Sequence, residues 1–241
     1  MGDSEGNATK SGPEGFRMPL IKSPADVEAL SHLSPDEKAL GVENLKKFPP
    51  SDGYFIMGND PDMQATLRIM EMEITSLLHP DHQGIPFSPM NLMALEVARH
   101  IGNDYLTGLM QNVTANTIGD FQKPYDHYMK LGMIENQDSA VWNDEQQLAI
   151  KFTRACLEFN MTDEVFEQAR AAWGEKKVLR YIAWISYVHQ WGMIQSALGM
   201  KYLPETMTYP RGSMTPEVID VVISKLKDTK EKVRKFWIEE T

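Results

Sequence analysis

The chain of 241 residues carries 34 acidic and 24 basic side chains, a formal net charge of -10 at pH 7. This balance repels phosphate backbones, so nucleic acid is not expected as a partner. The single cysteine, Cys156, excludes an intrachain disulfide and fits a reducing compartment. The most apolar stretch, residues 178–200, is interrupted by Arg180 and His189, which predicts a buried helix and no membrane span. We therefore expect a soluble, cytoplasmic protein.

The N-terminal segment, residues 1–17, is polar and rich in Gly, Ser and Asn, and it lacks the pattern of a signal peptide. We expect it to be a disordered tail. Alternating strand patterns bounded by tight turns are hard to find after residue 20. Residues 18–241 are therefore predicted to form one all-α domain.

Pairs of a capping residue and a proline mark the early helix starts, because proline at the first helical position loses only a donor that would be unpaired anyway. These pairs are Ser23-Pro24, Ser34-Pro35, Asp60-Pro61 and Ser88-Pro89. We expect the second helix to end at Lys47, the third at Leu78 and the fourth at Ile101. Residues 79–89 are expected to form a loop.

The second half of the chain continues the helical pattern. Gly102 predicts a break before another helix. The expected helices are residues 103–118, 125–131, 144–159 capped by Asn143, 163–173 capped by Thr162, 175–198, which is apolar on nearly all sides, and 215–237, which is amphipathic.

Two segments carry a family resemblance. Residues 91–119, NLMALEVARHIGNDYLTGLMQNVTANTIG, form a helix, a break and a helix, and residues 144–199 run from an acidic start to the long apolar helix. This pattern resembles the carboxymuconolactone decarboxylase-like superfamily, which includes alkylhydroperoxidase-D-like proteins. The resemblance implies an alkylhydroperoxidase-D-like helical bundle, extended here by N-terminal helices and a C-terminal amphipathic helix. It also implies a homo-oligomer, a trimer or a multiple of one, with a pocket between the helix pair and the long helix.

The peroxidase branch of this superfamily uses a glutamate, a Cys-x-x-Cys pair and a histidine. The matching positions here hold Asn91, Asn103, Leu106 and Met110. Every group of the thiol chemistry is therefore missing, and a thiol peroxidase is excluded. Cys156, among apolar neighbours on another helix, is interpreted as a core residue.

The decarboxylase-type branch instead carries Tyr-Glu-Trp followed by a histidine, and only Tyr105 of that pattern is present. The resemblance implies a cofactor-independent decarboxylase, or a related lyase or isomerase, that acts on a small organic acid or a polyketide-like molecule. In this hypothesis His189 or His100 is the acid or base, Tyr105 and Asn103 donate hydrogen bonds, and Arg99 holds a carboxylate. The alternative is a catalytically inactive binding or assembly protein on the same scaffold.

Other residues allow a functional and a structural interpretation. Glu96, His100 and Asp104 are spaced by four, so they share one helix face if the break at Gly102 is mild. That face is either an acid–base site or a solvated stripe, and no recognised metal motif includes it. Trp191 and Met110 either pack in the core or, with Asn91, line the substrate pocket, while His189 is either a satisfied buried imidazole or a proton donor and acceptor.

Overall fold

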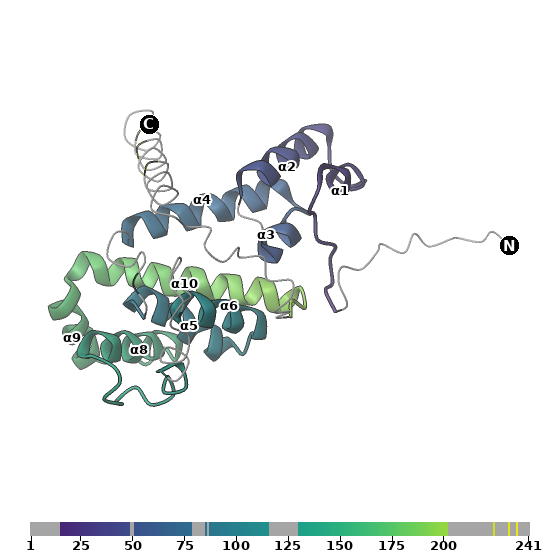
Figure 1. Ribbon diagram of the computed structural model, residues 1–241. Helices are drawn as coiled ribbons and strands as arrows, with labels where there is room; N and C mark the ends of the chain where they lie inside the picture. The colour runs from purple at the N-terminus through teal and green to yellow at the C-terminus, as the bar shows by residue number, and fades with distance from the viewer. Residues whose placement is uncertain are drawn as a thin grey trace.

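The computed structural model describes residues 15–48, 51–78, 85, 87–115 and 130–201, with the single positions 224, 231 and 235. Within these residues every regular element is a helix, which confirms the all-α prediction (Figure 1). None of the described helices combines the length and the apolar character that crossing a bilayer requires.

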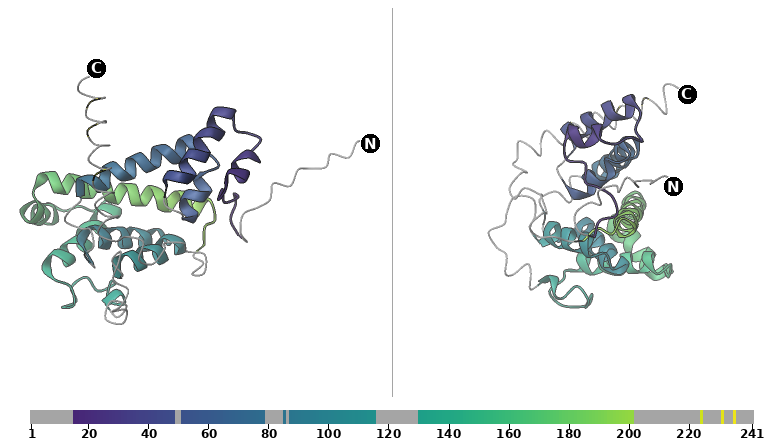
Figure 2. Two further views of the ribbon diagram at one scale, coloured as in Figure 1. Left: turned by 45° about the horizontal axis from the view of Figure 1, so that its top comes forward. Right: turned by 90° about the vertical axis from the view of Figure 1, so that its right-hand side faces the viewer.

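The helices form two layers with α10 between them (Figures 1 and 2). They are α1 (Pro24–Glu28), α2 (Pro35–Lys47), α3 (Asp52–Met57), α4 (Pro61–Leu78), α5 (Pro89–Ile101), α6 (Asp104–Ala115), α8 (Asp144–Leu157), α9 (Asp163–Trp173) and α10 (Glu175–Ala197). Helices α1–α4 lie on one side of α10, and α5, α6 and α8 lie on the other. Helix α10 itself packs against α4, α5, α6, α8 and α9.

The cap-and-proline pairs begin helices as predicted. Ser23 and Ser34 each form a full capping box, and Ser88 accepts a hydrogen bond from the backbone N–H of Asn91. Asp60 caps α4 by accepting from the N–H of Met63 at 2.9 Å. Each cap satisfies a donor that the helix itself leaves unpaired, so these helix starts could be predicted from the sequence.

Helix α3 is not among the helices that the sequence predicts. It has six residues and is capped by Ser51, whose hydroxyl accepts from the N–H of Tyr54 at 3.4 Å. A helix this short offers no repeated apolar spacing, and it persists because most of its side chains are buried against neighbouring helices.

Helices α5 and α6 form an antiparallel pair. Gly102 adopts a left-handed conformation with φ of 69° and ends α5, after which the side chain of Asn103 caps α6 by accepting from the N–H of Leu106 at 2.6 Å. At the other end of the pair, the hydroxyl of Thr114 donates to the carbonyl of Asn91 at 3.1 Å. The break is therefore a reversal, and Glu96, His100 and Asp104 do not share one continuous helix face, contrary to the expectation.

The main core lies where α5, α8 and α10 meet. Its fully buried side chains include Met93, Val97, Phe152 and Tyr181, and Cys156 packs against it from a half-buried position. A smaller cluster joins α5 and α8 to residues 131–142 through Leu92, Leu95, Leu131, Ile134, Trp142 and Ile150. The core therefore uses the helices that the apolar spacing marked.

Several expectations lie outside the described residues. They concern most of the N-terminal tail, most of the 79–89 loop, the end of the 103–118 helix, most of the 125–131 helix and nearly all of the 215–237 helix. Where helix ends are described they fall close to the expected positions, with α8 ending at Leu157 and not at Phe159.

Candidate functional site

Three of the residues chosen from sequence lie where α6 meets α10 and α3. The buried Tyr105 accepts a hydrogen bond on its hydroxyl from the N–H of Gly53 at 3.3 Å. The amide of Asn103 donates to the carbonyl of Gly192 at 3.3 Å and to the hydroxyl of Ser196 at 2.8 Å. A Cβ at Gly53 would meet the Trp191 ring at 3.7 Å. Tyr105, Asn103 and Trp191 therefore belong to one region.

Tyr105 is held in its protonated form. Burial raises the pKa of its phenol above the ordinary value of 10, and the negative charge of Asp52 raises it further. Together with the hydrogen bond from Gly53, this makes Tyr105 a fixed polar group that joins α6 to α3.

The two histidines are not joined to this region by any described contact. His100 is exposed near the end of α5, and His189 is half-buried on α10. Neither imidazole forms a hydrogen bond with another described residue. Their catalytic assignment stays a prediction.

The remaining sequence candidates are dispersed. Asp104 is exposed in the first turn of α6, and Asn91 is half-buried near the start of α5. Met110 packs between the two core clusters. Arg99 forms an ion pair with Glu135, so the guanidinium expected to hold a substrate carboxylate has an acid of the same chain as its neighbour.

Glu96 is not part of a solvated stripe, and that interpretation is corrected here. Its side chain is buried, and Nε of Arg154 lies 2.7 Å from its carboxylate. Arg154 also donates to the carbonyl of Ile134 at 2.8 Å. The pair therefore ties α5 and α8 to the segment that follows Leu131, which is a structural role.

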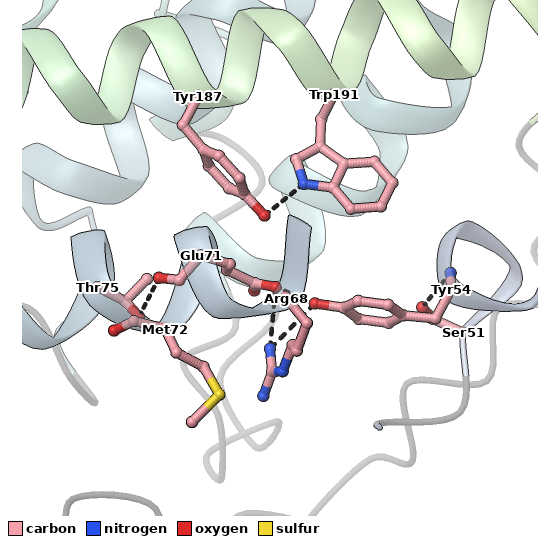
Figure 3. Close-up of polar contacts among 8 residues, drawn as sticks. All are labelled: Ser51, Tyr54, Arg68, Glu71, Met72, Thr75, Tyr187 and Trp191. Atoms are coloured by element: carbon pink, nitrogen blue, oxygen red, sulfur yellow. Dashed lines mark hydrogen bonds and ion pairs between the residues drawn. The ribbon is translucent and has the colours of Figure 1, made fainter. Parts of the chain in front are cut away.

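A second polar group lies between α4 and α10 and was not recognised from sequence. Figure 3 shows its centre, Glu71 of α4, whose carboxylate accepts a hydrogen bond from the hydroxyl of Tyr54. The guanidinium Nη1 of Arg68 lies 2.9 Å from the same carboxylate oxygen and 3.0 Å from the Tyr54 hydroxyl. One acid, one phenol and one guanidinium thus meet in a triangle of contacts.

Helix α10 contributes two aromatic side chains to this group. Tyr187 and Trp191 point from α10 toward α4, and the indole N–H of Trp191 donates to the Tyr187 hydroxyl (Figure 3). The rings of Trp191 and Tyr54 meet edge to face at 5.9 Å. Because Trp191 also contacts Gly53, the two polar regions are neighbours along α10.

The electrostatics of Glu71 set it apart from the other described carboxylates. Burial raises its pKa from 4.5 to about 7, while a hydrogen bond from Tyr187 acts in the opposite direction. The raised pKa therefore reflects desolvation that exceeds this opposing hydrogen bond. A carboxyl of this pKa exchanges protons at neutral pH.

Tyr187, unlike Glu71, does not exchange its proton at neutral pH. Burial raises its pKa above the ordinary value of 10, and the charge of Glu71 adds to that shift. Tyr187 therefore remains a neutral hydroxyl that can donate to Glu71 while it accepts from Trp191.

A surface groove adjoins this group through Tyr54. It has a volume of about 370 Å³, and its lining includes Lys22, Lys46, Phe48, Tyr54, Phe55 and Gln64. Tyr54 both lines the groove and hydrogen bonds to Glu71, so it connects a space that could hold a ligand with a carboxyl that can exchange a proton.

We call the set Tyr54, Arg68, Glu71, Tyr187 and Trp191 the Glu71 centre. Its members come from α3, α4 and α10. Two pairs are close in sequence, Arg68 with Glu71 and Tyr187 with Trp191, but they lie on different helices, so no motif spacing marks the set. One signal was available: Glu71 shares the stripe of Leu67, Met70 and Ile74, where an acidic residue interrupts apolar positions. In the residues that the structure describes, no three His, Cys, Asp or Glu side chains gather as metal ligands would.

We compared the chain with known protein families, curated proteins and solved structures. No protein-family model, curated protein or solved structure matches this chain. The candidate site therefore depends on its own geometry and electrostatics.

Proposed function

We propose that the protein is a cofactor-independent acid–base enzyme for a small organic acid or polyketide-like molecule, and that Tyr54 and Glu71 carry the proton transfer. The reaction is a decarboxylation or a related lyase or isomerase step on an alkylhydroperoxidase-D-like bundle, as the sequence resemblance implies. The observation that carries this proposal is Glu71, a largely buried carboxyl with a pKa of about 7 that accepts a hydrogen bond from the hydroxyl of Tyr54, a residue that lines a groove.

The chemistry needs a substrate that serves as its own electron sink. The bond between the carboxylate and its neighbouring carbon breaks, carbon dioxide leaves, and the electron pair moves into an adjacent carbonyl to form an enolate. The Tyr54 hydroxyl then gives its proton to the enolate carbon, and the Tyr54 oxygen regains a proton from Glu71. Solvent returns the proton to Glu71, which is possible because its side chain keeps 24% exposure.

The neighbours of Glu71 fit this cycle. When Glu71 is ionised, Arg68 at 2.9 Å compensates its charge, and Tyr187 donates a hydrogen bond to it. When Glu71 is protonated, Arg68 remains 3.0 Å from the Tyr54 oxygen, where it stabilises a transient phenolate. Both charge states of the centre therefore have a partner.

The test is proton exchange, because that step is shared by decarboxylases and isomerases. A panel of small β-keto and lactone carboxylates is incubated with the protein in D₂O, and deuterium incorporation and carbon dioxide release are followed. We expect Tyr54→Phe and Glu71→Gln to slow exchange by about 100-fold or more while the circular dichroism spectrum is unchanged.

Variants of the residues chosen from the sequence test the alternative catalytic site. His189→Ala, Tyr105→Phe and His100→Ala are expected to retain exchange if the Glu71 centre is responsible. Loss of exchange in these three, with Tyr54→Phe and Glu71→Gln fully active, would transfer the chemistry to the sites chosen from sequence. If no panel member reacts with any variant, the inactive binding or assembly protein becomes the better hypothesis.

The homo-oligomer stays a prediction of the family resemblance. It is supported by two apolar side chains that α10 leaves open, Leu179 at 67% and Met193 at 54% exposure. Light scattering on the eluting protein is expected to give a trimer or a multiple of it, and a monomer at all concentrations would contradict the prediction.

A further inference from the structure

The groove beside Tyr54 has a charge character of its own. The charged residues among its described lining are Lys22 and Lys46, and no described acid lines it. This contrasts with the whole chain, whose formal net charge is -10. A lining whose charged side chains are both lysines presents donors to an anionic ligand and none of the acceptors that a cationic ligand needs from a charged group.

Both ammonium groups can accept an additional anion. Lys46 pairs with Glu43 at 2.6 Å, but both side chains are largely exposed, and an exposed pair of this kind is weak and exchangeable. Lys22 lies 3.6 Å from the buried carboxylate of Asp52. Because an ammonium has three donors, Lys22 can keep Asp52 as a neighbour and still donate to a second carboxylate.

The apolar part of the groove is aromatic. Phe48, Tyr54 and Phe55 all line it, and the rings of Phe48 and Tyr54 lie 5.7 Å apart with a tilt of 46°. Lys22 sits 5.4 Å from the centre of the Phe55 ring, so the positive group and the aromatic surface are adjacent. Aromatic walls prefer a flat ring as occupant, since stacked and edge contacts add to area burial.

The amide side chains of the groove are already committed within the protein. Asn44 donates to Gln64 at 2.9 Å and to the carbonyl of Pro61 at 2.9 Å, and Gln64 donates to the carbonyl of Tyr54 at 2.7 Å. These bonds fix the wall of the groove behind Tyr54. They leave recognition of a ligand's polar end mainly to the two lysines.

We infer that this groove binds a planar aromatic monocarboxylate, with its ring against Phe48 and Tyr54 and its carboxylate toward Lys22 and Lys46. The volume of about 370 Å³ lies near the lower end for small-molecule pockets, which suits one or two fused rings. This inference deepens the proposed function, and it rests on that proposal only for the proton transfer by Tyr54. Binding itself needs no chemistry at Glu71.

The experiment uses the full chain and 2-naphthoate as probe, with the neutral 2-naphthamide and the cationic 2-naphthylmethylamine as matched ligands. Calorimetry and saturation-transfer NMR are run at constant ionic strength. We expect naphthoate to bind about tenfold or more tightly than either analogue, and Lys46→Met to weaken its binding by about fivefold.

Variants of Lys22 separate recognition from folding. Lys22→Met should weaken naphthoate binding by about tenfold, but it also leaves Asp52 without this counter-charge, so Lys22→Arg is made beside it and should bind within about threefold of the parent. The control is Lys151→Met, a partly exposed lysine on α8 that lies outside the groove and pairs with Glu164 at 3.9 Å, and this variant should bind as the parent does.

The outcomes for binding and for catalysis are distinguishable. Tyr54→Phe is expected to bind naphthoate and to lose proton exchange. Equal affinity for naphthoate and naphthamide, absence of naphthoate binding, or unchanged affinity in both Lys46→Met and Lys22→Met would overturn the inference, even if exchange is observed. Naphthoate binding without exchange on any panel member would instead reject the proposed function and keep the aromatic acid site.

Discussion

Helix α10 has two buried sides that differ in chemistry. Toward α5 and α6 it makes close apolar contact: a Cβ at Gly192 would lie 2.5 Å from the Cδ1 of Ile101, so the helices meet there without room for a methyl group. Toward α4 it presents Tyr187 and Trp191 to a carboxyl and a guanidinium (Figure 3). Apolar periodicity marks both sides as core, so the difference arises from the partner helix: α4 directs the carboxyl of Glu71 to Tyr187 of α10, whereas the buried acid of α5, Glu96, pairs with Arg154 of α8.

The largest expected effect concerns the apolar side. Phe152 of α8 is fully buried and meets Trp173 edge to face at 5.6 Å. Phe152→Ala removes these contacts and leaves a cavity, so we expect a loss of about 3–5 kcal/mol in the free energy of unfolding. Denaturant unfolding measures it, and a loss below about 1 kcal/mol would mean that this side is not a tightly packed core.

The second largest expected effect on stability concerns the ion pair between Arg154 and Glu96, which is largely buried between α8 and α5. Arg154→Met leaves the Glu96 carboxylate buried beside no positive charge, which should cost about 3 kcal/mol. Adding Glu96→Gln removes that charge and is expected to restore a large part of the lost stability in a double-mutant cycle. Equal instability of the single and double variants would show that the pair acts through packing and not through charge.

The pH dependence of stability tests the polar side of α10, where Glu71 lies. The folded pKa of Glu71 is about 7 and its ordinary value is 4.5, so the carboxyl favours the folded state fully below pH 4.5 and loses that contribution as the pH rises through 7. Glu71→Gln mimics the neutral form. The variant should therefore gain about 3 kcal/mol on the parent between pH 4.5 and pH 8, measured by unfolding at each pH.

If the difference in the free energy of unfolding between Glu71→Gln and the parent does not depend on pH, the prediction fails. The ionised carboxylate of Glu71 would then be well solvated or fully compensated by neighbouring charge. The matched control is Glu164→Gln, because Glu164 is 76% exposed on α9. Its stability relative to the parent should change little over the same pH range.

The smallest expected effect comes from the hydroxyl of Tyr187. Tyr187→Phe removes the acceptor of the Trp191 N–H, and we expect a loss of about 1 kcal/mol in the free energy of unfolding. The same change removes a hydrogen bond that lowers the pKa of Glu71, so that pKa should rise above the parent value. An unchanged titration of Glu71 in this variant would show that the two side chains are not coupled.

The sequence predicted the helical scaffold well and the candidate site poorly, for physical reasons. Helix starts such as Ser34-Pro35 are local, because a cap and its donor are only a few residues apart. The Glu71 centre depends on α4 packing against α10, which brings Tyr187 beside Glu71 across more than a hundred residues. The pattern that placed both helices in the core holds no information on which of their side chains meet.

For the same reason, the sequence did not predict where Glu96, His100 and Asp104 lie relative to one another. Their spacing is regular, but the left-handed Gly102 reverses the chain between α5 and α6, and burial beside Arg154 gives Glu96 a partner that spacing did not suggest. Tyr105, Asn103 and Trp191 do lie in one region, since all three sit where the helix pair contacts α10 or α3. These three residues are therefore neighbours in the structure, while the acid of the neighbouring group comes from α4, which the family resemblance did not include.

The measurement that tests the central claim most directly is the titration of the Glu71 carboxyl carbon by NMR, in protein labelled with carbon-13 at glutamate and assigned with Glu71→Gln. We expect a midpoint near pH 7, well above the ordinary value of 4.5. A midpoint at or below 4.5 would mean that Arg68 dominates the site, and the proposed proton transfer between Tyr54 and Glu71 would have no basis.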